Sequence, residues 1–169
     1  MSKRKSTVTL PNDRDVVVVR EFDAPRTLVF EAWTKPKLLQ RWLLGPPGWM
    51  MPVCEIDARP GGKFKWRWRN VESGAEFGFS GEFHEVVKPS RIVHVERHEP
   101  GDVGGEMGEA LVTSVFTEKS GVTTQSMTIR YESKEVRDTA LKTGMTDGME
   151  QSFAKLDELL VEVAARVGS

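Results

Sequence analysis

The pattern of apolar and polar residues divides the chain into three regions, and the first predicts a strand followed by two short helices. Residues 14–22 are rich in β-branched side chains and end at Asp23, which predicts a strand. Residues 26–33 carry apolar side chains at helical spacing, and a second short helix is expected to begin at Pro36. The Gly-Pro-Pro-Gly segment at residues 45–48 ends that second helix.

In the second region, residues 51–131, the period changes from that of a helix to that of a strand. Every even position of residues 63–69 is aromatic and every odd position is cationic, so one face is expected to be buried and the other solvated. Residues 76–87 repeat the alternation with phenylalanines. Further strands are expected at residues 91–97, 110–117 and 122–131, with a Gly-rich loop at 100–108. Consecutive hairpins of this kind predict an antiparallel meander.

The third region, residues 135–167, predicts one long helix. At 1.5 Å per residue, thirty helical residues span about 45 Å, so the helix needs a long partner surface, which the aromatic face of the sheet can supply. Two glycines, Gly144 and Gly148, fall inside the predicted helix. Its apolar stripe, at steps of mostly three and four, consists of Val136, Ala140, Met145, Met149, Phe153, Leu156, Leu160 and Val163.

Together these elements predict a single α+β domain at residues 14–165, in which a curved antiparallel sheet wraps around the long C-terminal helix. Residues 1–13 carry no apolar run and are expected to form a flexible N-terminal tail. The length of 169 residues fits one domain with a core of its own.

Composition narrows the classes of partner. A net charge of -1 favours neither nucleic acid nor an anionic membrane surface as a partner. No apolar stretch approaches the roughly 18 residues that a membrane-spanning helix requires. The single cysteine, Cys54, excludes an internal disulfide and a thiol metal cluster, and it indicates a reducing, cytoplasmic location.

Several segments resemble START-like (SRPBCC) helix-grip domains. Arg-Glu-Phe-Asp-Ala-Pro, at residues 20–25, is similar to the opening of these domains. Four further segments resemble one branch of them, the family related to the C-terminal domain of the activator of the heat-shock protein 90 ATPase. These segments are Ala-Trp-Thr-Lys-Pro (32–36), Arg-Trp-Leu-Leu-Gly-Pro (41–46), Asp-Ala-Arg-Pro-Gly-Gly-Lys-Phe (57–64) and Gly-Glu-Phe (81–83).

The resemblance implies the helix-grip fold and an internal cavity between sheet and helix that often takes an apolar ligand. It does not imply one particular function. This chain has Leu43-Leu44 after Trp42, where members often carry paired aromatic residues, and Met149 after Gly148, where members often carry Trp. The cavity shape of relatives therefore does not transfer to this chain.

The aromatic strands and the Met- and Gly-containing helix suggest which side chains line such a cavity. Methionine adapts to irregular ligands, and glycine on the helix leaves space opposite the large rings. The predicted lining residues are Trp42, Phe64, Trp66, Phe79, Phe83, His94, Met127, Met145, Met149 and Phe153. The alternative is that the same rings simply form a filled core.

Candidate catalytic chemistry is sparse. His94 and His98 are four residues apart but fall in a predicted strand and not on a helix, so they would lie about 13 Å apart, too far to share a metal ion. His94 with Glu96 is the best acid–base pair, because both face the same side of one strand. Cys54 has no neighbour that would activate its thiol. No catalytic residue and no cofactor is predicted.

Three functions remain open. The favoured one is a non-enzymatic binding domain for a small apolar or aromatic ligand. A chaperone-cofactor or stress-response interaction module is the first alternative, motivated by the resemblance and by a cationic stripe. That stripe consists of Lys63, Lys65, Arg67 and Arg69, which Glu76 and Glu82 could instead neutralise. The second alternative is a cyclase- or hydrolase-like enzyme that uses a cavity histidine. Monomer and homodimer are both compatible with the sequence.

Overall fold

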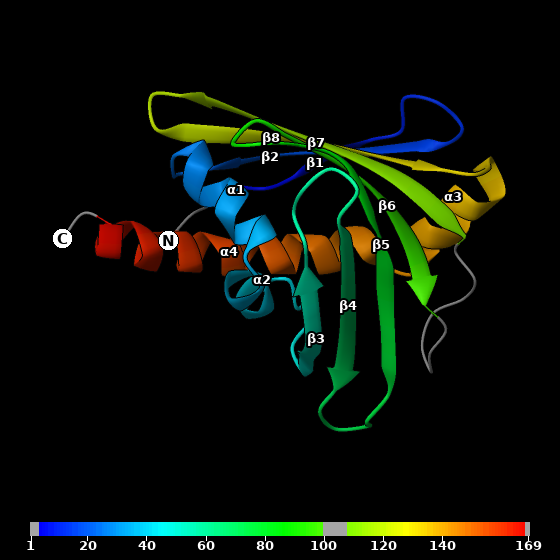
Figure 1. Ribbon diagram of the computed structural model, residues 1–169. Coiled ribbons are helices and arrows are strands. Elements are labelled where there is room, and N and C mark those ends of the chain that lie inside the picture. Colours follow the sequence, from blue (N-terminus) through cyan, green and yellow to red (C-terminus); the bar gives the residue numbers. More distant parts are fainter. Residues whose placement is uncertain (1–3, 100–107, 168–169) are drawn as a thin grey trace.

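A computed structural model of the protein describes residues 4–99 and 108–167. Within these residues, eight strands form one antiparallel sheet in the order β1-β2-β8-β7-β6-β5-β4-β3 (Figure 1). The strands are β1 (Thr7–Thr9), β2 (Asp15–Phe22), β3 (Trp49–Ile56), β4 (Lys63–Asn70), β5 (Glu76–Val87), β6 (Arg91–Glu99), β7 (Glu109–Lys119) and β8 (Val122–Tyr131). The predicted loop at 100–108 lies, except for Gly108, outside the described residues.

The helices lie on the inner, concave side of this sheet. In the described part of the chain they are α1 (Arg26–Thr34), α2 (Pro36–Trp42), α3 (Lys134–Lys142) and α4 (Met145–Val167). Figure 1 shows α4 running through the hollow of the curved sheet, with α1 and α2 packed beside it. The prediction of an α+β helix-grip fold with two short helices after the first long strand is therefore confirmed.

Strand β4 shows how the alternation in the sequence produces the inner face of the sheet. Its three aromatic residues, Phe64, Trp66 and Trp68, are buried, whereas Lys63 and Lys65 are exposed. The antiparallel register with β5 places Trp66 opposite Phe79 and Trp68 opposite Phe77. Rings from neighbouring strands therefore gather on one face, as cross-strand packing requires.

The prediction of one helix over residues 135–167 is wrong, because the chain breaks between α3 and α4. Gly144 has a φ of +82°, a left-handed conformation that ends α3 and that residues with a Cβ rarely adopt. Gly148, in contrast, lies inside α4. The predicted stripe has a five-residue step from Ala140 to Met145 at this break, whereas its other steps are of three or four residues.

The N-terminal segment is more ordered than the predicted tail. Thr7–Thr9 forms the edge strand β1, in which Thr7 pairs with Val19 of β2. The guanidinium of Arg4 lies 2.7 Å from a carboxylate oxygen of Glu21 and 2.7 Å from one of Asp23. Pairing with β2 thus fixes part of a segment whose own sequence has no apolar run.

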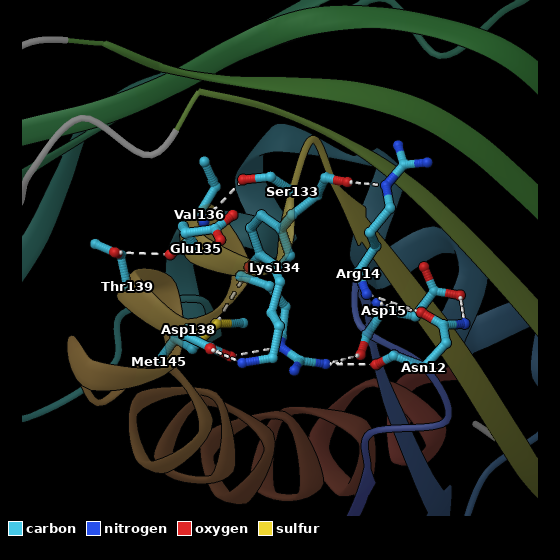
Figure 2. Close-up of polar contacts among 12 residues, drawn as sticks. Asn12, Arg14, Asp15, Ser133, Lys134, Glu135, Val136, Asp138, Thr139 and Met145 are labelled. Atoms are coloured by element: carbon cyan, nitrogen blue, oxygen red, sulfur yellow. Dashed lines mark hydrogen bonds and ion pairs between the residues drawn. The ribbon is translucent and has the colours of Figure 1, made fainter.

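Helix α3 is joined to the segment before β2 by polar contacts (Figure 2). The Ser133 hydroxyl caps the helix by accepting a hydrogen bond from the backbone N–H of Val136 at 3.2 Å. The side chain of Arg137, which is buried, donates to the backbone carbonyl oxygens of Asn12 at 2.7 Å and Asp15 at 3.3 Å. These contacts hold α3 at one end of the sheet and fix where α4 begins.

Candidate ligand-binding cavity

A cavity of about 370 Å³ lies between the inner face of the sheet and the first turns of α4. This volume is near the lower end of the roughly 300–1,000 Å³ range of small-molecule sites. Aromatic and aliphatic side chains form most of its wall. The lining residues are Trp33, Leu43, Leu44, Gly45, Pro46, Trp49, Trp66, Trp68, Phe77, Phe79, His94, Glu96, His98, Gly108, Ala110, Val112, Met127, Ile129, Tyr131, Thr143, Gly144, Met145, Gly148, Met149 and Ser152.

The structure places six of the ten predicted lining residues at this cavity and four in the packed core. The six at the cavity are Trp66, Phe79, His94, Met127, Met145 and Met149. The four in the core are Trp42, Phe64, Phe83 and Phe153. Trp42 stacks on Phe153 with ring centroids 6.1 Å apart, and Phe64 contacts Phe83 at 5.6 Å. These four rings fill the hollow next to the cavity rather than facing its space.

Other lining residues were not predicted, although some carried a signal. Trp68 and Phe77 have the same strand parity as Trp66 and Phe79, so the alternation already placed them on the inner face. Glu96 and His98 likewise share the parity of His94. The remaining rings come from elements whose local patterns do not reveal the cavity. They are Trp33 of α1, Trp49 of β3 and Tyr131 of β8.

The cavity contains one pair of hydrogen-bonded ionisable side chains. Nε2 of His94 lies 2.9 Å from Oε1 of Glu96, two residues along β6. Alternation along the strand places both side chains on the inner face, as the sequence predicted. The other imidazole nitrogen, Nδ1 of His94, is buried and has no hydrogen-bond partner among the described residues.

Trp66 contributes a second unpartnered polar atom. Its indole Nε1 is buried without a hydrogen-bond acceptor in the part of the chain that the structure describes. Three other tryptophans do have acceptors: Trp33 donates to Gln125, Trp42 to the carbonyl of Ala32 and Trp68 to the carbonyl of Leu43. The ring of Trp66 lies with its centroid 6.2 Å from that of His94.

Two more ionisable side chains, those of His98 and Tyr131, line the cavity in addition to His94 and Glu96. Burial lowers the pKa of His98, so the neutral imidazole is favoured, and its buried Nε2 has no partner within the described residues. Burial, followed by the charge of Glu96, raises the pKa of Tyr131. The Tyr131 hydroxyl donates to Sδ of Met145 at 3.2 Å, which fixes the start of α4 against β8.

The charge of the cavity is set by Glu96. Its described lining contains no lysine and no arginine, so an anionic ligand would find no cationic partner there. Over residues 4–99 and 108–167, no group of three or more His, Cys, Asp or Glu is arranged to hold a metal ion. The described lining therefore offers apolar contact and hydrogen bonding to a ligand.

The cationic stripe on the outer face of β4 is largely neutralised within the protein. Arg67 lies 3.1 Å from Glu76 and 3.3 Å from Glu99, and Arg69 lies 2.8 Å from Glu76. Lys65 lies 4.0 Å from Glu99. Of the two interpretations of the stripe, the structure favours a solvated face paired with acidic neighbours.

None of the described helices has both the length and the apolar character that crossing a membrane requires.

The fold and cavity define a helix-grip domain, and comparison with known proteins identifies its branch. The chain belongs to the AHSA1 family, described as Activator of Hsp90 ATPase homolog 1-like protein, which matches residues 23–161. The resemblance recognised in the sequence is therefore confirmed. No curated protein matches the chain.

Solved structures of similar fold come from several bacteria. A crystal structure of a protein from Rhodobacter sphaeroides is 27% identical, with a TM-score of 0.84 over 94% of this chain and 99% of that one. Protein Ms6760 from Mycobacterium smegmatis is 24% identical, with a TM-score of 0.80 over 92% and 96% of the two chains. An AHSA1-like protein from Aeromonas hydrophila is 20% identical, with a TM-score of 0.64 over 85% and 93%.

Proposed function

We propose that this protein is a binding domain for a small, neutral, largely aromatic molecule held between the sheet and α4. The observation that carries the proposal is the composition of the cavity wall. Four rings of β4 and β5, those of Trp66, Trp68, Phe77 and Phe79, line the cavity opposite the start of α4. Such rings offer large contact areas and prefer to pack against other aromatic groups.

The opposite wall supports the same proposal. Met145 and Met149 line the cavity from the first turns of α4, and Met127 lines it from β8. Methionine side chains are flexible and polarisable, so they adjust to ligands of different outline. Gly148 contributes no side chain at the same place. A rigid aromatic wall and an adaptable methionine wall together suit a flat ligand.

Methyl NMR tests this proposal directly, with naphthalene as the probe and ¹³C-methyl-labelled methionine in the protein. Naphthalene should shift the methyl resonances of Met127, Met145 and Met149, because all three line the cavity. Met50 is 41% exposed and lies outside the cavity, so its resonance serves as an internal control. Shifts absent from the three cavity methionines, at naphthalene concentrations up to its solubility, would refute the proposal.

A matched pair of variants separates cavity binding from surface binding. Met149→Trp places a bulky indole ring in the cavity. Val161→Trp introduces the same ring at a residue of α4 that is 72% exposed. Naphthalene binding should be lost in the first variant and kept in the second. Native mass spectrometry of the freshly purified protein, compared with the denatured protein, would then identify any natural ligand that is retained.

The family description motivates a second candidate, a module that binds a chaperone ATPase. The feature of this chain that suggested it, the cationic stripe on β4, is paired with Glu76 and Glu99 and so offers less free charge to an acidic partner. A pull-down from cell extract that recovers no chaperone would count against this candidate.

The lone Cys54 supports a reducing, cytoplasmic location for either function.

A further inference from the structure

We propose that the cavity selects an aromatic ligand that carries a hydroxyl group, and that the hydroxyl is held between His94 and Trp66. This inference rests on the proposed function and specifies the ligand class. The first question is which nitrogen of the His94 imidazole carries the hydrogen. A carboxylate can only accept hydrogen bonds, so the 2.9 Å contact with Glu96 requires that Nε2 of His94 carries the hydrogen. In the neutral imidazole, Nδ1 is then left as an acceptor.

Trp66 supplies the complementary group. Its indole Nε1–H can only donate. Trp66 and His94 are each only 5% exposed, both line the cavity, and their ring centroids lie 6.2 Å apart. Neither Nε1 nor Nδ1 has a partner within the described structure. Buried polar atoms are nearly always paired in folded proteins, so an unmet donor and an unmet acceptor on two neighbouring rings of one cavity point to a missing ligand group.

Few ligand groups satisfy both atoms at once. A hydroxyl oxygen accepts from an N–H and donates its own hydrogen, so one hydroxyl can serve Trp66 and His94 together. A ketone or ether has no hydrogen to give to Nδ1. A carboxylate also lacks that hydrogen, and its charge would face Glu96 in a described lining without lysine or arginine. His98 lies four residues along β6 from His94, about 13 Å away, and does not belong to this pair.

The surroundings favour an aryl hydroxyl over an alkyl one. Phe64 and Phe83 enclose the imidazole with ring centroids 5.3 Å and 6.0 Å away, and Trp66 encloses it from β4. The negative charge of Glu96 strengthens Nδ1 as a proton acceptor, and a stronger acceptor prefers the more acidic hydroxyl. A phenol supplies both the acidic hydroxyl and a ring for the aromatic wall.

Calorimetric titration of four matched probes tests the inference. The probes are naphthalene, 2-naphthol, 2-methoxynaphthalene and 2-naphthoate. 2-Naphthol should bind at least about tenfold more tightly than naphthalene and the methyl ether, because leaving site hydrogen bonds unpaired is costly. 2-Naphthoate should bind most weakly. Equal affinity for 2-naphthol and naphthalene would overturn the inference but leave the proposed function standing, whereas no binding of any probe would remove both.

Variants assign the preference to the two residues. His94→Phe and Trp66→Phe should each reduce the affinity for 2-naphthol by a larger factor than the affinity for naphthalene, so that the ratio of the two affinities falls toward one. His84→Phe, which alters an exposed histidine of β5, should leave all four affinities unchanged. A full preference for 2-naphthol in His94→Phe would refute the assignment.

A readout independent of affinity comes from ¹⁵N NMR of the histidine ring. In the free protein, Nε2 of His94 should carry the hydrogen and Nδ1 should not, and binding of 2-naphthol should shift Nδ1 much more than Nε2. A hydrogen on Nδ1 in the free protein, with Nε2 bare, would contradict the argument at its first step.

Discussion

Asp157 of α4 and Arg20 of β2 form a bidentate ion pair, in which one carboxylate oxygen lies 2.9 Å from Nη1 and the other lies 2.7 Å from Nη2. The Arg20 side chain is 2% exposed and that of Asp157 is 13% exposed. The guanidinium also lies 4.9 Å from the ring centroid of Phe22 and 5.9 Å from that of Phe153. This contact joins the middle of the long helix to the sheet.

Removing one partner of the Arg20–Asp157 ion pair should destabilise the folded protein. Asp157→Asn leaves a buried guanidinium without a counter-charge, and we expect the free energy of unfolding to fall by about 3–5 kcal/mol. Replacing both partners, as Arg20→Met with Asp157→Leu, should restore a large part of that loss. Urea unfolding measures both. The Glu162→Gln variant, which removes the solvent-exposed ion pairs with Arg41 and Arg166, should leave stability almost unchanged.

The two glycines near the start of α4 should respond in opposite directions to the same substitution. Gly144 has a φ of +82°, so Gly144→Ala should destabilise the fold by about 1–2 kcal/mol. Gly148 is helical, and an added Cβ would meet only Pro46 at 3.8 Å, so Gly148→Ala should stabilise by up to about 1 kcal/mol. Thermal unfolding of the two variants and the unmodified protein measures both changes in stability. Destabilisation by Gly148→Ala would show that the methyl group does not fit against Pro46.

The helix break also shows where sequence reasoning fails for this fold. Strand alternation in β4 and β5 is local, so the inner face of the sheet could be predicted from single segments. The apolar stripe steps five residues from Ala140 to Met145 across Gly144, so the break left a sign in the sequence that the prediction of one continuous helix overlooked. Strand β1 was missed for a different reason, since the interaction that orders it comes from β2 and not from its own residues.

The candidate site was only partly predictable, because sequence parity gives the face of a side chain and not the space in front of it. Trp66 and Phe64 lie on the same face of β4, yet Trp66 lines the cavity and Phe64 packs against Phe83. The pairing of His94 with Glu96 follows from their two-residue spacing and could be anticipated. That Nδ1 and the indole of Trp66 lack partners depends on the packing of several elements.

Partly buried His98 should make the free energy of unfolding depend on pH. Its pKa in the folded protein is lower than the ordinary value because burial disfavours the charged ring. The folded state therefore binds the proton less readily than the unfolded state, and stability is fully present above about pH 6.5 and decreases as the pH falls below it. His98→Gln should remove this part of the decrease. Urea unfolding between about pH 7 and pH 5.5 measures it, and equal slopes for both proteins would refute the assignment.

Cys54 should react slowly in the native protein. Burial raises the pKa of its thiol to about 11 from an ordinary value of 9.0. The thiolate is the reactive form, so its fraction at neutral to mildly alkaline pH should be about a hundredfold smaller than in the unfolded chain. The rate of alkylation by iodoacetamide at pH 8, in native buffer and in urea, checks this expectation. A native rate close to the unfolded rate would mean that the thiol is more accessible than the structure shows.

The placement of His94 and Glu96 on one strand has an evolutionary consequence. Their two codons are separated by a single codon, and both side chains line the cavity. A few nucleotide changes close together in the gene can therefore alter both members of the polar pair. The polar lining of the cavity can thus vary independently of the five segments that carry the family resemblance, because those segments lie elsewhere in the chain.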